Sequence, residues 1–227
     1  MANAKRILTI VTSHAELADT GTKTGFWLEE LAVPYLAFVE GGLQVDICSP
    51  KGGQPPPDPK SESNPTAAVK SFLADSKATA KLASTLRIAD VREPYDAYFV
   101  VGGHGVMWDL AVDSDLQALL ASAHASGRVI AAVCHGPAAL VNVRLPDGTF
   151  LCKDKRVAGF SNEEEAAVGL DEIVPFALQS ALSERGRRYE SGPPWGSFVV
   201  ADGKLVTGQN PASSLAVAKG VLQALAS

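Results

Sequence analysis

Short apolar segments of strand length alternate with helical segments along most of the chain, and this alternation constrains the fold more than any other feature. Such alternation predicts an α/β protein with an open, mostly parallel sheet and helices on both faces, a flavodoxin-like or Rossmann-like three-layer sandwich. The predicted strands lie at 6–13, 43–50, 95–101, 128–133, 155–160, 197–203 and 204–209. Helices are predicted at 25–42, with Thr24 as its N-terminal cap, and at 66–86, 114–127 and 211–226, and a further helix at His135 and the residues after it.

The 227 residues are enough for one large domain, and residues 1–227 are predicted to form one. The segment 51–90 interrupts the alternation and is predicted to be an inserted loop and helix region. Five of the fifteen residues at 51–65 are prolines, so regular structure is not expected there. A helix is expected to follow at 66–86.

Charge and cysteine content exclude several classes of protein. The net charge is −5 and no cluster of Lys and Arg could neutralise several phosphates, so nucleic acid is not an expected partner. No segment has the length of a membrane span or the pattern of a signal peptide, so neither a membrane nor secretion is expected. The three cysteines are sparse and lack a CxxC spacing, which favours a reducing cytoplasm over a disulfide framework or a zinc ribbon.

Cys134 follows the apolar run at 128–133 directly, where the predicted strand turns into the next helix. Ala132 and Gly136 stand two positions away on either side, and a nucleophile on a sharp strand-to-helix turn requires such small residues. The turn would expose the sulfur, and a helix N-terminus would favour its thiolate form. Cys48, inside a predicted strand, and Cys152 instead fit the common pattern of buried, inert cysteines.

A second loop with unusual residues, GGHG at 102–105, follows another predicted strand. Sites in open parallel sheets lie beyond the carboxyl ends of the strands, so this loop and Cys134 are expected to face each other. Gly103 would let the backbone approach and donate N–H groups to an oxyanion. His104 either contacts the substrate or has a surface role.

Five motifs together resemble the ThiJ/PfpI superfamily, whose fold resembles the glutaminase domain of class I glutamine amidotransferases. Within it, the chain is most similar to the branch of stress chaperones and glutathione-independent glyoxalases (glyoxalase III). The motifs are AAVCHGPAAL, VVGGHGVMWDL, TKTGFWLEELAVPY, DICSPKGG and LVTGQNPASS.

The resemblance implies catalytic roles for Cys134, His135 and two glutamates. The first glutamate stands five residues after Gly25, which is Glu30; its helical neighbours are apolar, but those of Glu29 are mostly apolar too. The second stands five residues after Phe160, which is Glu165, and would orient His135, with Glu164 as the alternative. Trp195 either walls the pocket or packs elsewhere.

The resemblance implies conversion of methylglyoxal and related 2-oxoaldehydes to 2-hydroxy acids through a cysteine hemithioacetal. The alternatives are a holdase chaperone with unfolded protein clients, a protein deglycase and a PfpI-type peptidase. A glutaminase is excluded because its triad needs a histidine near the C-terminus, and no histidine follows His135. No cofactor and no required metal are predicted, since the histidines and carboxylates lack a tight metal-binding spacing. The resemblance also implies a homodimer.

Overall fold

A seven-stranded sheet forms the middle layer of the computed structural model, which describes residues 4–92, 94–184 and 188–227. Its strand order is β3-β2-β1-β4-β5-β9-β8, and every neighbouring pair is parallel except β8 and β9. The predicted α/β fold with a mostly parallel sheet is therefore confirmed. The strands are β1 (Arg6–Ile10), β2 (Gln44–Ser49), β3 (Leu86–Arg87), β4 (Ala97–Val100), β5 (Val129–Val133), β8 (Val199–Asp202) and β9 (Leu205–Gly208).

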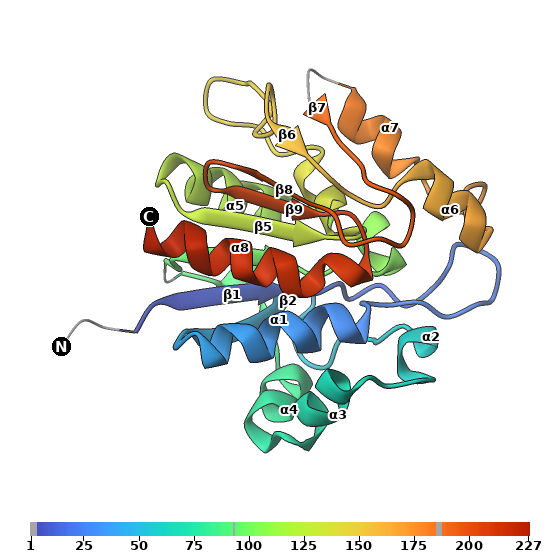
Figure 1. Ribbon diagram of the computed structural model, residues 1–227, viewed down its shortest axis with the longest axis horizontal. Helices are drawn as coiled ribbons and strands as arrows, with labels where there is room; N and C mark the ends of the chain where they lie inside the picture. Colours follow the sequence, from blue (N-terminus) through green and yellow to red (C-terminus); the bar gives the residue numbers. More distant parts are fainter. Residues whose placement is uncertain (1–3, 93, 185–187) are drawn as a thin grey trace.

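Helices cover the sheet on both faces (Figure 1). Helices α1 (Leu28–Glu40) and α8 (Ser214–Ala226) pack against each other on one face, and α5 (Ser114–Ala125) lies on the other. All residues of β4 and β5 are buried, as expected for central parallel strands with both faces covered. No helix in the described ranges is both long enough and apolar enough to cross a membrane.

The region 51–90 contains three short helices where the sequence predicts a single long one. The proline-rich segment includes one short helix, α2 (Pro59–Glu62), because proline is well suited to the first helical position and the Asp58 carboxylate accepts a hydrogen bond from the Lys60 N–H. The helix predicted at 66–86 is two helices, α3 (Ala67–Ala74) and α4 (Ser76–Ala83). Asp75 separates them: its backbone is extended, and its carboxylate caps α4.

One predicted helix start and one predicted helix length are also wrong. Helix α1 begins at Leu28 rather than at residue 25, and Thr24 does not cap it but donates its hydroxyl hydrogen bond to Asp58. Residues 25–27 instead run beside residues 56–57 and the glycine loop, with which they form backbone hydrogen bonds. After Cys134 the chain forms only a short, fully buried 3₁₀ helix, η3 (Gly136–Leu140), where a longer helix was expected.

The segment between β5 and β8 forms a unit at the edge of the sheet. The strand predicted at 155–160 is shortened to β6 (Arg156–Val157), which pairs with β7 (Arg188–Tyr189) in a separate two-stranded sheet. Helices α6 (Asn162–Val168) and α7 (Leu178–Ser183) lie between them in the chain. Three further 3₁₀ turns are η1 (Ile88–Asp90), η2 (His104–Met107) and η4 (Pro211–Ser213).

Candidate active site

Cys134 occupies a strained turn between β5 and η3. Its φ angle is +59°, in the left-handed region that residues other than glycine rarely adopt. Two long-range backbone hydrogen bonds hold it there: its N–H donates to Gly208 O (3.0 Å), and its carbonyl accepts from the Phe160 N–H (2.9 Å). A Cβ on Gly136 would lie 2.5 Å from the Val100 carbonyl oxygen, so the turn requires glycine at that position. The elbow expected from the small-residue spacing is thus present.

The surroundings of the sulfur differ from the exposed thiolate expected from the sequence. Only 4% of Cys134 is exposed. Burial and the neighbouring Glu30 carboxylate raise the pKa of the thiol well above its usual range, although the N–H groups of His135 and Gly103 lower it. The expectation fails mainly because the sulfur is buried, which disfavours its charged form, and the short η3 turn offers little positive dipole to offset this. The resting thiol is therefore protonated.

Glu30, on α1, lies beneath the elbow and is completely buried. Its Oε2 accepts a hydrogen bond from the Gly102 N–H at 2.9 Å, whereas Oε1 has no hydrogen-bond partner among the described residues. Gly102 has no room for a side chain, since a Cβ would lie 2.4 Å from Glu30 Oε2. Burial raises the pKa of Glu30 to about 8, against a smaller lowering by its contact with Cys134. Of these two adjacent glutamates, Glu30 contacts the thiol, whereas Glu29 is half-buried.

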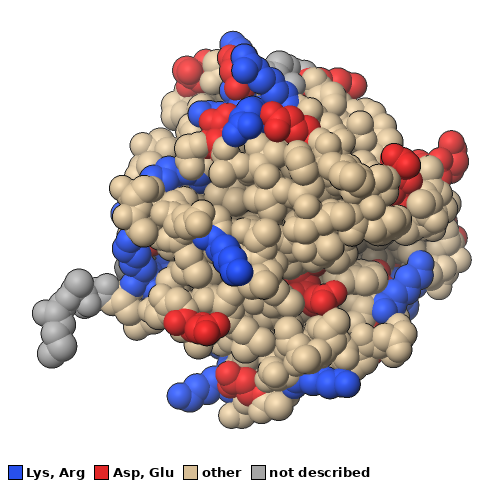
Figure 2. All heavy atoms as spheres, in the orientation of Figure 1, with Lys and Arg blue, Asp and Glu red and all other residues tan. Residues whose placement is uncertain are grey.

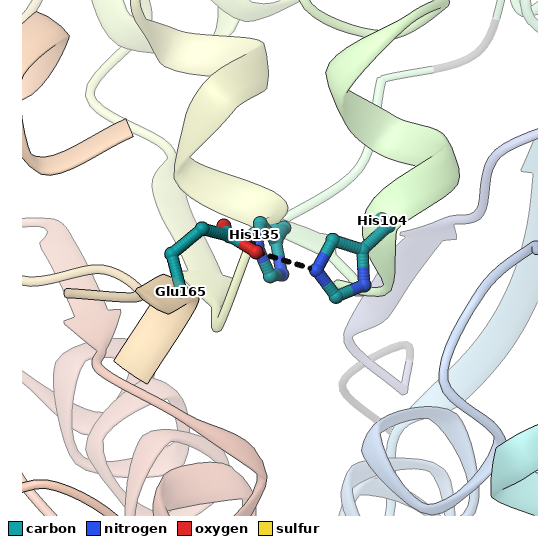
Figure 3. A group of neighbouring side chains, drawn as sticks. All are labelled: His104, His135 and Glu165. Carbon is teal, nitrogen blue, oxygen red and sulfur yellow. Dashed lines mark hydrogen bonds and ion pairs between the residues drawn. The ribbon is translucent and has the colours of Figure 1, made fainter. Parts of the chain in front are cut away.

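The side chains of His135, Glu165 and His104 converge on one point (Figure 3). His135 Nδ1 lies 3.3 Å from Cys134 Sγ, and His135 Nε2 lies 2.7 Å from Glu165 Oε2. His104 Nε2 contacts the second carboxylate oxygen, Oε1, at 2.8 Å. Burial alone would raise the pKa of Glu165, but its hydrogen bonds with both histidines hold it at about 2. Burial and the neighbouring His104 lower the pKa of His135 to about 4. Glu165 is thus a carboxylate and His135 a neutral imidazole near neutral pH.

Glu164, the alternative partner for His135, has a different place. It forms a capping box with Ser161 at the start of α6 and is fully buried. Its Oε1 accepts hydrogen bonds from the Trp195 N–H and from Asn210 Nδ2, both at 2.8 Å. Trp195 has a φ of +62°, so Glu164 and Asn210 brace a strained loop. Sequence reasoning did not single out Asn210, although it lies in the LVTGQNPASS motif.

A small pocket opens above the sulfur. Its volume is about 90 Å³, several times smaller than the pockets of roughly 300–1,000 Å³ that hold drug-sized ligands. Trp195 contributes to its wall and stacks edge-on against Phe160, with ring centroids 5.8 Å apart. Trp108 is not part of the lining and stacks on His14 instead. The lining residues are Trp27, Gly103, His104, Cys134, His135, Phe160, Val168, Trp195 and Pro211.

The structure therefore brings together all six residues singled out for the site. Gly103, His104 and Glu30 come from the glycine loop and α1, while Cys134, His135 and Glu165 come from the elbow and α6. The proximity of His104 to Glu165 had no counterpart in the sequence pattern, because 61 residues separate them. On the face drawn in Figure 2, acidic and basic side chains are interspersed and separated by uncharged surface.

The chain is similar over nearly its whole length to known proteins. The sequence model of the DJ-1/PfpI family matches residues 22–224. Glutathione-independent glyoxalase HSP31 of Saccharomyces cerevisiae is 30% identical over 239 residues, which cover 97% of this chain and 98% of the yeast protein. The crystal structure of glyoxalase III from Candida albicans superposes with a TM-score of 0.90 at 29% identity, covering 97% of both chains. Rapid Encystment Protein 24 kDa of Francisella tularensis gives a TM-score of 0.94 at 39% identity, covering 97% of this chain and 99% of that one.

Proposed function

The chain belongs to the DJ-1/PfpI family, and from this premise we propose that it is a glutathione-independent glyoxalase. It converts methylglyoxal and related 2-oxoaldehydes to 2-hydroxy acids. Two proteins similar to it over nearly their whole length, from Saccharomyces cerevisiae and Candida albicans, carry the names glutathione-independent glyoxalase and glyoxalase III.

One observation carries the proposal: a cysteine on a strained elbow contacts two groups that can exchange a proton with it, at the floor of a small pocket. Glu30 and His135 both contact Cys134, and each is uncharged near neutral pH, because burial raises the pKa of Glu30 to about 8 and lowers that of His135 to about 4. An uncharged imidazole can accept a proton, whereas the protonated Glu30 can return one. The pocket volume of about 90 Å³ suits a substrate of a few non-hydrogen atoms.

The first step forms a bond between Cys134 Sγ and the aldehyde carbon, C1. The thiol proton passes to His135 Nδ1, 3.3 Å from the sulfur, or to Glu30 once this carboxyl is ionised. The electron pair of the C1 carbonyl moves to its oxygen, which the N–H groups of Gly103 and His135 can stabilise. Return of the proton to this oxygen gives a hemithioacetal.

The second stage exchanges oxidation level between two adjacent carbons. Glu30 or His135 removes the C1 proton to give an enediol, and reprotonation at C2 leaves a thioester of the 2-hydroxy acid. Water then hydrolyses the thioester, which releases the acid and regenerates the thiol. C1 is oxidised and C2 reduced within one molecule, so the net change is the addition of one water.

The test is direct measurement of lactate from methylglyoxal in a buffer free of glutathione and other thiols. We expect wild-type protein to form lactate, and Cys134→Ser to form none above background, because a serine hydroxyl is far less acidic than a thiol and His135, whose pKa is lowered to about 4, is a weak base. Loss of methylglyoxal without lactate would show adduct formation only and would contradict the proposal. Equal lactate formation by Cys134→Ser would place the reaction elsewhere.

A holdase role is a second candidate because Val168 and Trp195, at the mouth of the pocket, are 37% and 50% exposed. Such a role would be independent of the thiol. Suppression of client aggregation by Cys134→Ser would support it, and failure of the wild-type protein to suppress aggregation would exclude it for that client. The small pocket argues against a peptidase, which must accommodate a peptide segment.

The proposal includes a homodimer in a reducing cytoplasm. Members of the superfamily that the motifs resemble often form dimers, and the reaction needs Cys134 as a thiol. Light scattering after size exclusion tests the dimer, and cell fractionation tests the compartment. A monomeric mass or recovery from an oxidising compartment would contradict the respective part.

A further inference from the structure

We propose that His104, His135 and Glu165 form a binding site for Zn²⁺, and that the bound metal reversibly inhibits the cysteine. The metal would be an inhibitor, not a required cofactor. The three side chains come from η2, the elbow and α6, three segments that the fold brings to one point (Figure 3). Each offers one ligand atom, and these atoms lie within 4.8 Å of one another.

The donor set matches the chemistry of zinc. Two imidazole nitrogens and one carboxylate are a known set of three protein ligands for Zn²⁺ sites that keep a fourth position open. Zinc lies about 2.0–2.1 Å from imidazole nitrogen and about 2.0–2.2 Å from carboxylate oxygen, so tetrahedral ligand atoms lie about 3.3 Å apart. The two Nε2 atoms now lie 2.7 and 2.8 Å from the carboxylate oxygens, so only a small widening would admit the ion.

The side chains are already held in place. The His135 ring packs against both Phe160 and His104, with centroid distances of 4.4 and 4.1 Å. Glu165 is held at the first turn of α6, whose start is fixed by the capping box of Ser161 and Glu164. Little conformational freedom would therefore be lost on binding, which favours affinity.

The pocket provides both access and the fourth position. His104 and His135 line it, and 12% of the His104 side chain is exposed, so a cation can reach the cluster from the pocket with a water as its fourth ligand. Cys134 Sγ faces the opposite ring nitrogen of His135, Nδ1, and is not among the clustered ligand atoms. The site is thus expected to bind metal without the thiol.

Inhibition follows from the tautomer that the metal imposes, and this part depends on the proposed function. When Nε2 of His135 binds Zn²⁺, the remaining proton must lie on Nδ1, which faces the sulfur. His135 then cannot accept the thiol proton, and Glu165 no longer accepts its hydrogen bond. Metal in the pocket also obstructs the approach of the aldehyde to Cys134.

The binding test uses Cys134→Ser protein, so that neither thiolate ligation nor turnover contributes. Zn²⁺ is titrated by calorimetry, and Co²⁺ is titrated as a spectroscopic probe of the ligands. We expect one ion per chain and tetrahedral Co²⁺ bands without thiolate charge transfer. Replacing His104 by Gln in this background should weaken binding by at least about tenfold. His124→Gln, a histidine on α5 outside the cluster, is the matched control and should bind as before.

Three results would overturn the site: no saturable binding, undiminished binding after His104→Gln, or equal weakening by His124→Gln. Circular dichroism shows whether each variant is folded. Glu165→Gln is a second ligand variant if His104→Gln does not fold. In the wild-type protein, Zn²⁺ should abolish lactate formation and a chelator should restore it. If the protein forms no lactate but binds metal as described, the function fails and the site stands; if it forms lactate but binds no metal, only the site fails.

Discussion

Glu30 and Glu165 are both buried beside the same pocket, yet their pKa values move in opposite directions. Burial raises the pKa of Glu30 to about 8, because its carboxyl accepts just one backbone hydrogen bond from the described residues, from the Gly102 N–H, and this bond and the contact with Cys134 lower the pKa by less than burial raises it. Burial acts on Glu165 as well, but two histidine contacts hold its pKa at about 2. The carboxyl group is the same in both; the donors around it differ.

This difference assigns the two glutamates different tasks in the proposed reaction. Glu30 exchanges a proton near neutral pH and contacts the sulfur, as a general acid–base group requires. Glu165 remains ionised and holds the ring of His135 in position. A buried carboxylate with enough donors is an orienting group, and one with too few becomes a proton carrier.

The largest loss of activity is expected when Glu30 is changed. We expect Glu30→Gln to lower the rate of lactate formation by roughly a hundredfold or more, the usual size of an acid–base contribution, because the shape is retained and the exchangeable proton is lost. Glu29→Gln, the matched change one residue earlier, should leave the rate nearly unchanged. If Glu29→Gln is the impaired variant, the assignment of the proton carrier is wrong.

A smaller loss is expected at Glu165. Glu165→Gln retains one hydrogen-bond acceptor but removes the charge that orients His135, so the rate should fall by roughly tenfold or more, less than for Glu30→Gln. The exposed Glu163→Gln is the control on the same helix turn. An unchanged rate in Glu165→Gln would mean that His135 needs no orienting carboxylate.

The two glutamates should also affect stability in different pH ranges and with opposite signs, Glu30 above pH 4.5 and Glu165 below it. Below pH 4.5 Glu30 is protonated in the folded and unfolded states; between pH 4.5 and about 8 only the folded state keeps the proton. Folding stability attributable to Glu30 is therefore lost as pH rises through this window, at no more than about 1.4 kcal/mol per pH unit. Chemical denaturation at pH 5, 6.5 and 8 gives the free energy of unfolding of wild type and of Glu30→Gln, and the difference between the two proteins should change with pH. A difference that stays constant with pH would contradict the raised pKa.

Glu165 is expected to act on the acid side. Its folded-state pKa of about 2 lies below its ordinary value of 4.5, so the stability it contributes is present above pH 4.5 and is lost as pH falls toward 2. Acid denaturation of wild-type protein and Glu165→Gln, followed by circular dichroism, compares the two. Wild type should lose more stability than the variant between pH 4.5 and 2. An equal loss would contradict the lowered pKa of Glu165.

The smallest effect on activity is expected at Glu164, the neighbour of Glu165 in the chain. It braces the Trp195 loop without touching His135 or Cys134, so Glu164→Gln should raise KM a few-fold with little change in kcat. Trp195→Phe, which keeps an aromatic wall, should bind substrate more like wild type. A fall in kcat comparable to that of Glu165→Gln would mean that Glu164 also positions the catalytic histidine.

Patterns among residues close together in the sequence predicted the features that depend on local geometry. Alternating strands and helices indicated the parallel sheet, and the small residues Ala132 and Gly136 indicated the elbow at Cys134, because a tight turn excludes side chains locally. Helix boundaries were less predictable: Asp75 interrupts one predicted helix, and Thr24 bonds to Asp58 instead of capping another. The competing partner of Thr24 stands 34 residues away, beyond any local window.

The sequence by itself determined the sheet, the elbow and, with the family spacing, the choice of Glu30 over Glu29. Only the tertiary structure decided that Glu165 rather than Glu164 contacts His135, that His104 joins them, and that the resting thiol is protonated. These outcomes depend on desolvation and on hydrogen bonds between segments 30 to 72 residues apart. Backbone periodicity is encoded by neighbours in the chain, whereas the electrostatics of a buried group is set by whatever the fold packs around it.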